Sequence, residues 1–406
     1  MKTERAYPAV RIDARGAQKA QAGHPWVFDN EITDVLGTPE DGALCDVLSP
    51  KDRYLGTGFY NSRSKIRVRL LSRNANDDFS PAFWRRRLQY AWDYRKTVLG
   101  GQVDNARVIF GESDQLPGLT VDKFGDILVT QTLCLGTELL KPLLFPLLAE
   151  VLETDGVSIR GIFKRNDVKI RELEGLSQGK GWFPLPGKAT PTETATQIVE
   201  NGIRYTVDFE NGQKTGFFLD QRFNRAATAR LAAGKTVLDC FTHTGSFGLN
   251  CAAAGAKHVH SVDISETAIA QARANCALNG LTDRVDYETA NVFDLLPTVP
   301  HGAYDLIILD PPAFTKSGKT VDSATRGYKE INYRAMKALP RGGYLATCSC
   351  SHFITNELFR KMLQSAARDA GVELKLIEAR AQGPDHPVLW NVPETDYLKF
   401  YLFQVI

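Results

Sequence analysis

The sequence lacks long uninterrupted apolar runs, low-complexity tracts and internal repeats. Its most apolar stretch, residues 139–152, is broken by Lys141, Pro142 and Pro146, which argues against a membrane-spanning helix. Residues 1–10 contain no apolar core of the kind that secretory signal peptides carry. We therefore expect neither secretion nor membrane insertion, and place the protein in the cytoplasm.

Cysteine is scarce, and no charge sign dominates. The seven cysteines show no regular spacing, which fits a reducing compartment better than a disulfide framework and leaves thiols available for chemistry. The net charge of +2 neither demands nor excludes a polyanionic partner. Its distribution is uneven, because residues 63–96 are locally basic. The cations of this stretch that we expect to contact RNA phosphates are Lys65, Arg67, Arg69, Arg85, Arg86 and Arg87.

A chain of 406 residues is expected to form two or three domains. Residues 1–75 have short alternating runs between turn residues and predict a small β-domain. Residues 76–195 predict a mixed α/β domain that begins with a helix over 81–98 and ends in a Gly- and Pro-punctuated linker over 179–191. Residues 196–406 alternate strand and helix patterns from Lys235 onward, which predicts a parallel sheet with helices on both faces. Ligands of such sheets bind at the carboxyl ends of the strands.

The stretch from Val237 to Gly248 predicts a buried strand, a small-residue turn and a helix. Gly245 permits close backbone approach, and Thr244 or Ser246 could cap the helix. This arrangement favours a nucleotide-like ligand, yet it lacks the G-x-G-x-x-G fingerprint of dehydrogenases.

The next strand end carries Asp263, which could hold both ribose hydroxyls of a nucleoside, and the strand after it leads to Asn291, which could meet an adenine edge. Taken alone, an aspartate ending a strand is usually a turn residue, but this order and spacing favour a binding site. The candidates in these turns are Asp239, Phe241, Thr244, Gly245, Asp263, Ile264, Asn291 and Val292, with Asp310 and Pro311 from a later strand end.

With these turns, three further motifs resemble the RlmI-like family of class I ribosomal large-subunit cytosine-5 methyltransferases. They are residues 24–28 (His-Pro-Trp-Val-Phe), 110–119 and 211–222. The resemblance implies an N-terminal PUA-like β-barrel that binds RNA, a central α/β domain and a C-terminal Rossmann-like domain with a seven-stranded sheet. It also implies S-adenosylmethionine as cofactor and suggests a homodimer. By the same resemblance, the methionine end of the cofactor is wrapped by Lys214, Thr215, Gly216, Asp220 and Gln221.

The segment Asp310-Pro311-Pro312 ends a buried strand and is typical of methyltransferases that act on planar bases. Its prolines fix the backbone, so that the carbonyls and the acid point to one place. Enzymes that methylate amino groups usually carry an aromatic residue directly after the second proline. Here Ala313 takes that position and Phe314 follows, which favours another target atom.

Another strand end in the same sheet carries Cys348 and Cys350. Carbon 5 of cytosine needs activation by a thiolate added to carbon 6, with an acid near ring N3 to stabilise the adduct. Cys348 matches the Thr-Cys-Ser signature of RNA cytosine-5 methyltransferases, so we assign it as the nucleophile and Asp310 as the acid. Cys350 could assist, or could itself be the nucleophile. A zinc site at Cys348, Cys350 and His352 would lack a fourth ligand, so we expect no metal.

The sequence therefore predicts transfer of a methyl group to carbon 5 of an unpaired or flipped cytosine in RNA, and the resemblance implies that this RNA is large-subunit ribosomal RNA. Two alternatives stay open. One is non-covalent methylation of an amino group or a guanine through Asp310. The other is a non-catalytic RNA-binding assembly factor that retains an inactive domain.

Overall fold

The computed structural model describes residues 6–315 and 317–406, and the chain folds into two compact units. The first unit contains the chain up to Ile198, together with Val207–Leu219 and Pro384–Thr395. The second contains Val199–Thr206, Asp220–Gly383 and Asp396–Ile406. The division at residues 75 and 195 stays a prediction from the sequence.

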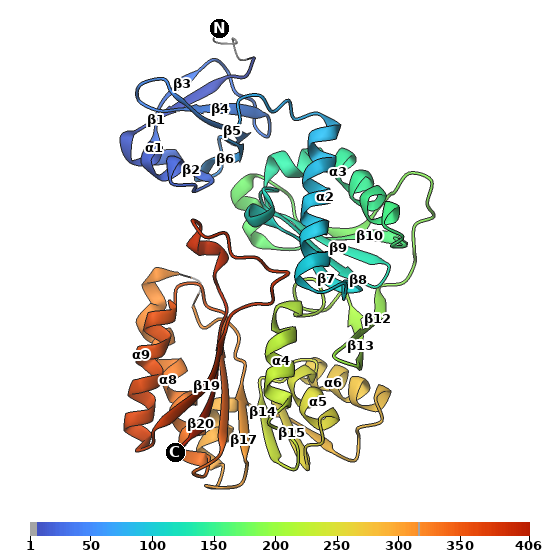
Figure 1. Cartoon of the computed structure of the whole chain (residues 1–406), viewed down its shortest axis with the longest axis vertical. Helices are drawn as coiled ribbons and strands as arrows, with labels where there is room; N and C mark the ends of the chain where they lie inside the picture. The colour runs from blue at the N-terminus through green and yellow to red at the C-terminus, as the bar shows by residue number, and fades with distance from the viewer. Residues whose placement is uncertain (1–5, 316) are drawn as a thin grey trace. The chain divides into compact units, whose positions relative to one another are not determined.

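The N-terminal part of the first unit is a six-stranded sheet in the order β2-β6-β5-β4-β1-β3 (Figure 1). Its elements are β1 (Ala9–Ile12), α1 (Ala14–Gln21), β2 (Trp26–Phe28), β3 (Ile32–Leu36), β4 (Leu44–Leu48), β5 (Tyr54–Tyr60) and β6 (Ile66–Ser72). Val10, Val47 and Val68 are fully buried in its core. The expected small β-domain is confirmed.

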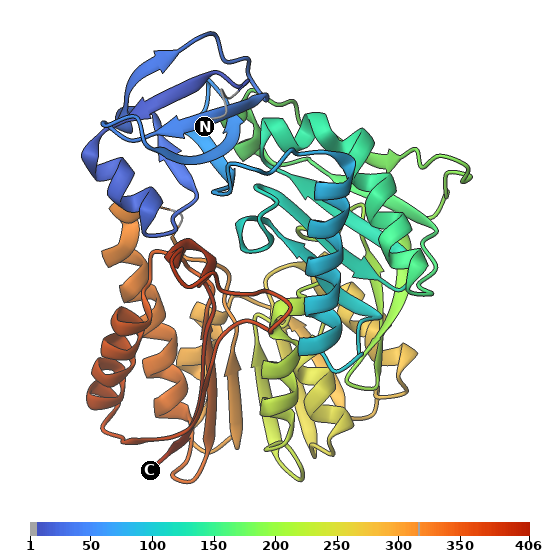
Figure 2. The same ribbon diagram turned by 45° about the horizontal axis from the view of Figure 1, so that its top comes forward.

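A second sheet of the first unit has the order β11-β10-β9-β8-β7. Its elements are α2 (Pro81–Val98), β7 (Asn105–Phe110), β8 (Leu119–Phe124), β9 (Ile127–Thr132), α3 (Leu135–Thr154), β10 (Gly161–Arg165) and β11 (Lys180–Phe183). Helices α2 and α3 lie side by side (Figure 2). The helix expected over 81–98 is confirmed, whereas the linker expected over 179–191 is wrong in part, because β11 pairs antiparallel with β10 there.

The second unit is built on a seven-stranded sheet in the order β16-β15-β14-β17-β18-β20-β19. Its strands are β14 (Thr236–Cys240), β15 (His258–Asp263), β16 (Val285–Thr289), β17 (Leu306–Leu309), β18 (Tyr344–Ser349), β19 (Leu374–Arg380) and β20 (Lys399–Val405). Its helices are α4 (Arg222–Ala229), α5 (Ser246–Ala253), α6 (Glu266–Leu278), α7 (Val292–Leu295), α8 (Val321–Ala338) and α9 (Asn356–Ala370). A hairpin of β12 (Ala195–Glu200) and β13 (Ile203–Asp208) spans the boundary between the units.

The expected parallel direction is correct for six of the seven strands and wrong for β20. Strands β14 to β18 pair in parallel, but β20 runs antiparallel to both β18 and β19. The carboxyl ends of β14, β15, β17 and β18 therefore share one edge with the start of β20. The register pairs Ser349, the last residue of β18, with Lys399, the first residue of β20.

Helices cover both faces of this sheet, because successive side chains of a strand point to opposite sides. In β14, Leu238 and Cys240 belong to a core that includes Tyr328 and Ile331 of α8. Asp239 lies between them in sequence and faces the start of α5, where it accepts a hydrogen bond from the backbone of Gly248. Asp239 is thus held between the sheet and a helix. Among the described residues, no helix is both long and apolar enough to cross a membrane.

Candidate cofactor and catalytic site

The turn between β14 and α5 is tightly bent. Phe241, His243 and Gly245 all have positive φ angles, of 61°, 51° and 84°. A side chain at Gly245 would place its Cβ 3.2 Å from both the Cβ of Ala272 and the hydroxyl of Tyr287. Position 245 therefore needs glycine for its backbone conformation and for its close approach to α6.

Asp239 lies beneath this turn with an unsatisfied oxygen. Its Oδ2 accepts hydrogen bonds from the Thr242 hydroxyl at 2.5 Å and from the Gly248 amide at 2.8 Å. Burial raises the pKa of Asp239 to about 7. Among the described residues, neither its Oδ1 nor the buried hydroxyl of Thr244 has a hydrogen-bond partner. Two orphaned polar atoms beside a glycine turn are suited to a polar ligand.

The ends of β15 and β16 supply the other expected side chains. The two carboxylate oxygens of Asp263 accept hydrogen bonds from the amides of His243, at 2.9 Å, and Ser265, at 3.0 Å. Each oxygen keeps a further lone pair for a hydroxyl group. The next residue, Ile264, leaves 71% of its surface exposed, so it offers apolar surface at the end of β15.

Asn291 caps the short helix α7. Its side-chain oxygen accepts from the Phe293 amide at 3.1 Å, and its nitrogen donates to Asp294 at 2.9 Å. Val292 is buried. The ring of Phe293 lies 5.7 Å from that of Phe314, which in turn lies 6.5 Å from the ring of Phe241. The structure thus adds Phe314 to the aromatic lining of these turns.

Asp310 follows β17 and contacts Gln221 and Cys348, of which the sequence analysis associated it only with Cys348. Its Oδ1 accepts a hydrogen bond from the Gln221 amide at 2.9 Å, and its carboxyl group also bonds the thiol of Cys348. Desolvation, followed by the nearby charge of Asp220, raises the pKa of Asp310 to about 6, although part of the residue is exposed. An acid and a thiol therefore meet at adjacent strand ends.

The two candidate cysteines have different environments. Cys348 is fully buried, and burial, with the neighbouring Asp310, raises the pKa of its thiol well above the usual value. Cys350 is partly exposed, and its sulfur lies 3.9 Å from the carbonyl oxygen of Pro311. Among the described residues, no three His, Cys, Asp or Glu side chains are grouped as metal ligands.

The residues expected at the methionine end of the cofactor divide between the two units. Asp220 and Gln221 belong to the second unit, where Asp220 accepts a hydrogen bond from the Tyr397 hydroxyl at 2.5 Å. Lys214, Thr215 and Gly216 belong to the first unit, where the Thr215 hydroxyl donates to Asp122 at 2.5 Å. The role of residues 214–216 therefore stays a prediction from the sequence.

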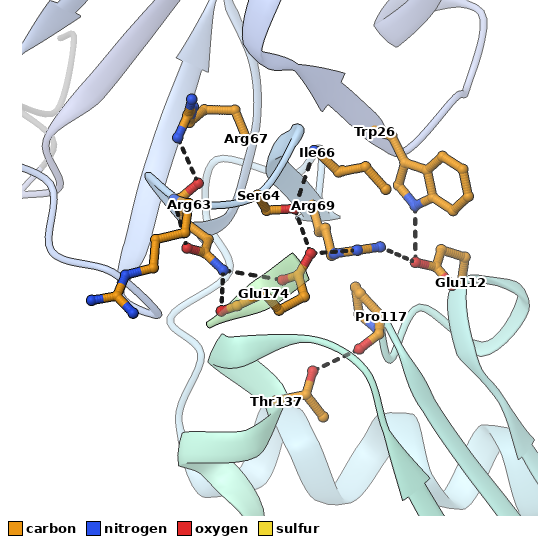
Figure 3. Close-up of polar contacts among 11 residues, drawn as sticks. Trp26, Arg63, Ser64, Ile66, Arg67, Arg69, Glu112, Pro117, Thr137 and Glu174 are labelled. Atoms are coloured by element: carbon orange, nitrogen blue, oxygen red, sulfur yellow. Dashed lines mark hydrogen bonds and ion pairs between the residues drawn. The ribbon is translucent and has the colours of Figure 1, made fainter. Parts of the chain in front are cut away.

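Two of the cations expected to contact RNA are buried against partners inside the protein. Arg69 reaches Glu112 at 3.2 Å and Glu174 at 2.9 Å in the network of Figure 3. Arg87 donates to the carbonyl oxygens of Gln115, at 2.7 Å, and Leu71, at 2.5 Å. Both arginines are buried, because segments distant in the chain close over them and supply these partners. The RNA-binding proposal no longer includes them.

The other four cations are at least partly exposed. Lys65 and Arg86 are exposed, whereas Arg67 and Arg85 are half-buried. Arg67 donates to the carbonyl oxygen of Asn61 at 3.1 Å, and Arg85 pairs with Glu150. Lys65 and Arg86 thus remain the most accessible candidates for phosphate contacts.

Comparison with known protein families gives two matches along the chain. Residues 185–404 match the family described as S-adenosylmethionine-dependent methyltransferase, and residues 10–73 match the PUA-like domain. The chain is 41% identical to the ribosomal RNA large subunit methyltransferase I of Shewanella denitrificans, over 96% of this chain and 98% of that protein. It is 36% identical to the protein of the same name from Klebsiella pneumoniae, over the full length of both.

Solved structures share the fold at lower sequence identity. A candidate S-adenosylmethionine-dependent methyltransferase from Streptococcus mutans is 21% identical, with a TM-score of 0.80 over 98% of this chain and 99% of its own. The candidate methyltransferase SMU.776, solved with SAH bound, reaches a TM-score of 0.82 at 21% identity over the same shares of the two chains. The expected architecture, a PUA-like domain followed by a Rossmann-like methyltransferase domain, is confirmed, and so is S-adenosylmethionine as the cofactor.

Proposed function

The chain belongs to the S-adenosylmethionine-dependent methyltransferase family, and from this premise we propose that it methylates carbon 5 of a cytosine in large-subunit ribosomal RNA. The names of its full-length relatives support the RNA substrate. The thiols at the end of β18, beside Asp310, support carbon 5 of cytosine as the atom that is methylated. An enzyme for ribosomal RNA would work in the cytoplasm.

The residues at the strand ends suit the cofactor. Asp263 would accept hydrogen bonds from the ribose hydroxyls, while Ile264 and Phe293 offer apolar surface to the adenine ring. The unsatisfied oxygen of Asp239 lies at the same turn. Bound S-adenosylmethionine supplies an electrophilic methyl group.

The protein side chains would activate the base. A cysteine thiolate adds to carbon 6 of cytosine, the carbon 5–carbon 6 double bond opens, and carbon 5 becomes nucleophilic. Asp310, whose raised pKa keeps part of its population protonated near neutral pH, would donate a hydrogen bond at ring N3. After methyl transfer, a base accepts the proton from carbon 5, the carbon 5–carbon 6 double bond re-forms, and the cysteine leaves carbon 6 as a thiolate.

We propose Cys350 as the thiolate, in place of the Cys348 assignment made from the Thr-Cys-Ser signature. Cys348 is fully buried and hydrogen-bonded to Asp310, an environment that opposes ionisation of the thiol. Cys350 is partly exposed, so a base could reach its sulfur. Partial exposure at a strand end is the observation that supports this choice.

Paired alanine variants test the assignment. We expect Cys350→Ala to lose methyl transfer to RNA by at least about a thousandfold and to form no covalent adduct with RNA that contains 5-fluorocytidine. Cys348→Ala, the matched control, should keep adduct formation, and both variants should bind S-adenosylmethionine in calorimetry. Adduct formation by Cys350→Ala and its loss in Cys348→Ala would reverse the assignment. Full methylation without either thiol would indicate non-covalent transfer.

A further inference from the structure

Lys399 is a buried cation next to the proposed nucleophile. Only 5% of its surface is exposed. Its ammonium group donates hydrogen bonds to two backbone carbonyl oxygens, those of Ser351 and Tyr397, each at 2.8 Å. Ser351 directly follows Cys350, so these contacts hold the ammonium against the backbone that carries the thiol.

The charge of Lys399 is poorly compensated. Among the described residues, Lys399 forms no ion pair with a carboxylate, and its hydrogen bonds go to neutral carbonyl oxygens. A buried ammonium without a counter-charge is costly. Two neighbouring groups raise the pKa of Lys399 and so stabilise its positive charge. Cys350 has the larger effect and Asp396 the smaller.

Two of the other titratable groups near Cys350 are neutral at pH 7. Tyr328 of α8, whose hydroxyl lies 2.9 Å from that of Ser351, has its pKa raised to about 12 by burial. Burial also raises the pKa of the Cys348 thiol. Burial lowers the pKa of Lys399 to about 8, which leaves the ammonium mostly protonated at pH 7. Asp310 precedes Pro311, whose carbonyl contacts the Cys350 sulfur, and its pKa of about 6 leaves it mostly ionised at pH 7. This carboxylate opposes ionisation of the thiol, and Lys399 is the cation that favours it.

We propose that Lys399 is a positioning residue, whose buried ammonium holds the Cys350 thiol in its anionic form for attack on the base. The proposal rests on the proposed function for its choice of Cys350. A thiolate supplies the counter-charge that the ammonium otherwise lacks, and the ammonium in turn favours ionisation of the thiol. Because the carbonyl contacts fix the ammonium, the thiolate is available before RNA binds.

Alkylation of Cys350 by iodoacetamide tests the proposal on the full-length protein, without RNA. The rate is followed from pH 5.5 to 9.5 by peptide mass spectrometry, since only the thiolate reacts. We expect the wild-type midpoint to lie below the ordinary thiol value of about 8.5. Lys399→Met should raise the midpoint and slow alkylation at pH 7 about tenfold, which corresponds to a shift of about one pH unit. Lys399→Arg, which keeps the charge, should stay close to wild type.

Lys123→Met is the matched control. Lys123 is also buried and also donates to two carbonyl oxygens, those of Val103 and Asp104, but it lies in the other unit. Its removal should leave the Cys350 profile unchanged. A wild-type midpoint at or above about 8.5 would overturn the proposal even if Lys399→Met failed to fold, and so would equal profiles for wild type and a folded Lys399→Met. Methyl transfer by Cys350→Ala would instead overturn the proposed nucleophile and leave the alkylation result standing.

Discussion

At the scale of single residues, the protonation of Asp239 makes the free energy of unfolding depend on pH. Its pKa of about 7 in the folded protein lies above the ordinary aspartate value of about 3.9. Between these values the folded state keeps a proton that the unfolded chain releases, so the free energy of unfolding falls as pH rises. This one group can contribute a slope of at most about 1.4 kcal/mol per pH unit.

Asp239→Asn should therefore flatten the pH dependence of stability, because asparagine has no proton to release. Urea unfolding of wild type and variant at intervals from pH 4.5 to 7.5 measures the effect. We expect the two curves to converge or cross as pH rises. Parallel curves over this range would contradict the buried, protonated carboxyl group.

Single residues also show what the sequence could reveal of the site. Asp263 ends β15, and Asn291 and Asp310 follow β16 and β17, so their place at the sheet edge was predictable. The burial of Arg69 was not predictable, because the sequence around it cannot show that Glu112 and Glu174, which are distant in the chain, close over its side chain. Lys399 was missed, since it lies in no motif. The signal for it was a lone cation at the start of an otherwise largely apolar strand.

At the scale of elements, the turn between β14 and α5 depends on Gly245. Gly245→Ala should destabilise the protein by about 1–2 kcal/mol, because alanine is disfavoured at positive φ and its Cβ would press against α6. It should also weaken S-adenosylmethionine binding at least about tenfold in calorimetry. Gly255→Ala is the control: its φ is 92°, but no atom lies within 4 Å of the added Cβ. Equal loss of binding in both variants would argue against a cofactor role for the turn.

The elements of the second unit were largely predictable, but not all their directions. The alternation of strands and helices was predicted, and elements such as the helix over 266–278 and the strand over 344–349 are defined locally by apolar periodicity and capping residues. The direction of β20 is not a local property. An apolar run such as residues 400–403 looks the same in a parallel or an antiparallel strand, and only its partners decide.

At the scale of the whole molecule, Arg69 joins the two sheets of the first unit (Figure 3). Arg69→Met should lower the free energy of unfolding of this unit by about 3–5 kcal/mol, because Glu112 and Glu174 would lose their buried counter-charge. Lys65→Met, at an exposed position, should leave stability unchanged and weaken RNA binding, with a shallower salt dependence. Urea unfolding and RNA titration at several salt concentrations separate these effects. Unchanged stability of Arg69→Met together with weaker RNA binding would instead indicate that Arg69 contacts RNA.

The central claim is that this methyltransferase modifies carbon 5 of a cytosine in ribosomal RNA. Nucleoside mass spectrometry of large-subunit RNA from a deletion strain, before and after complementation, tests it most directly. We predict that one 5-methylcytidine is lost on deletion, restored by the wild-type protein and not restored by Cys350→Ala. Loss of a methylated guanosine or of an amino-methylated base, or no change in methylation, would contradict the account.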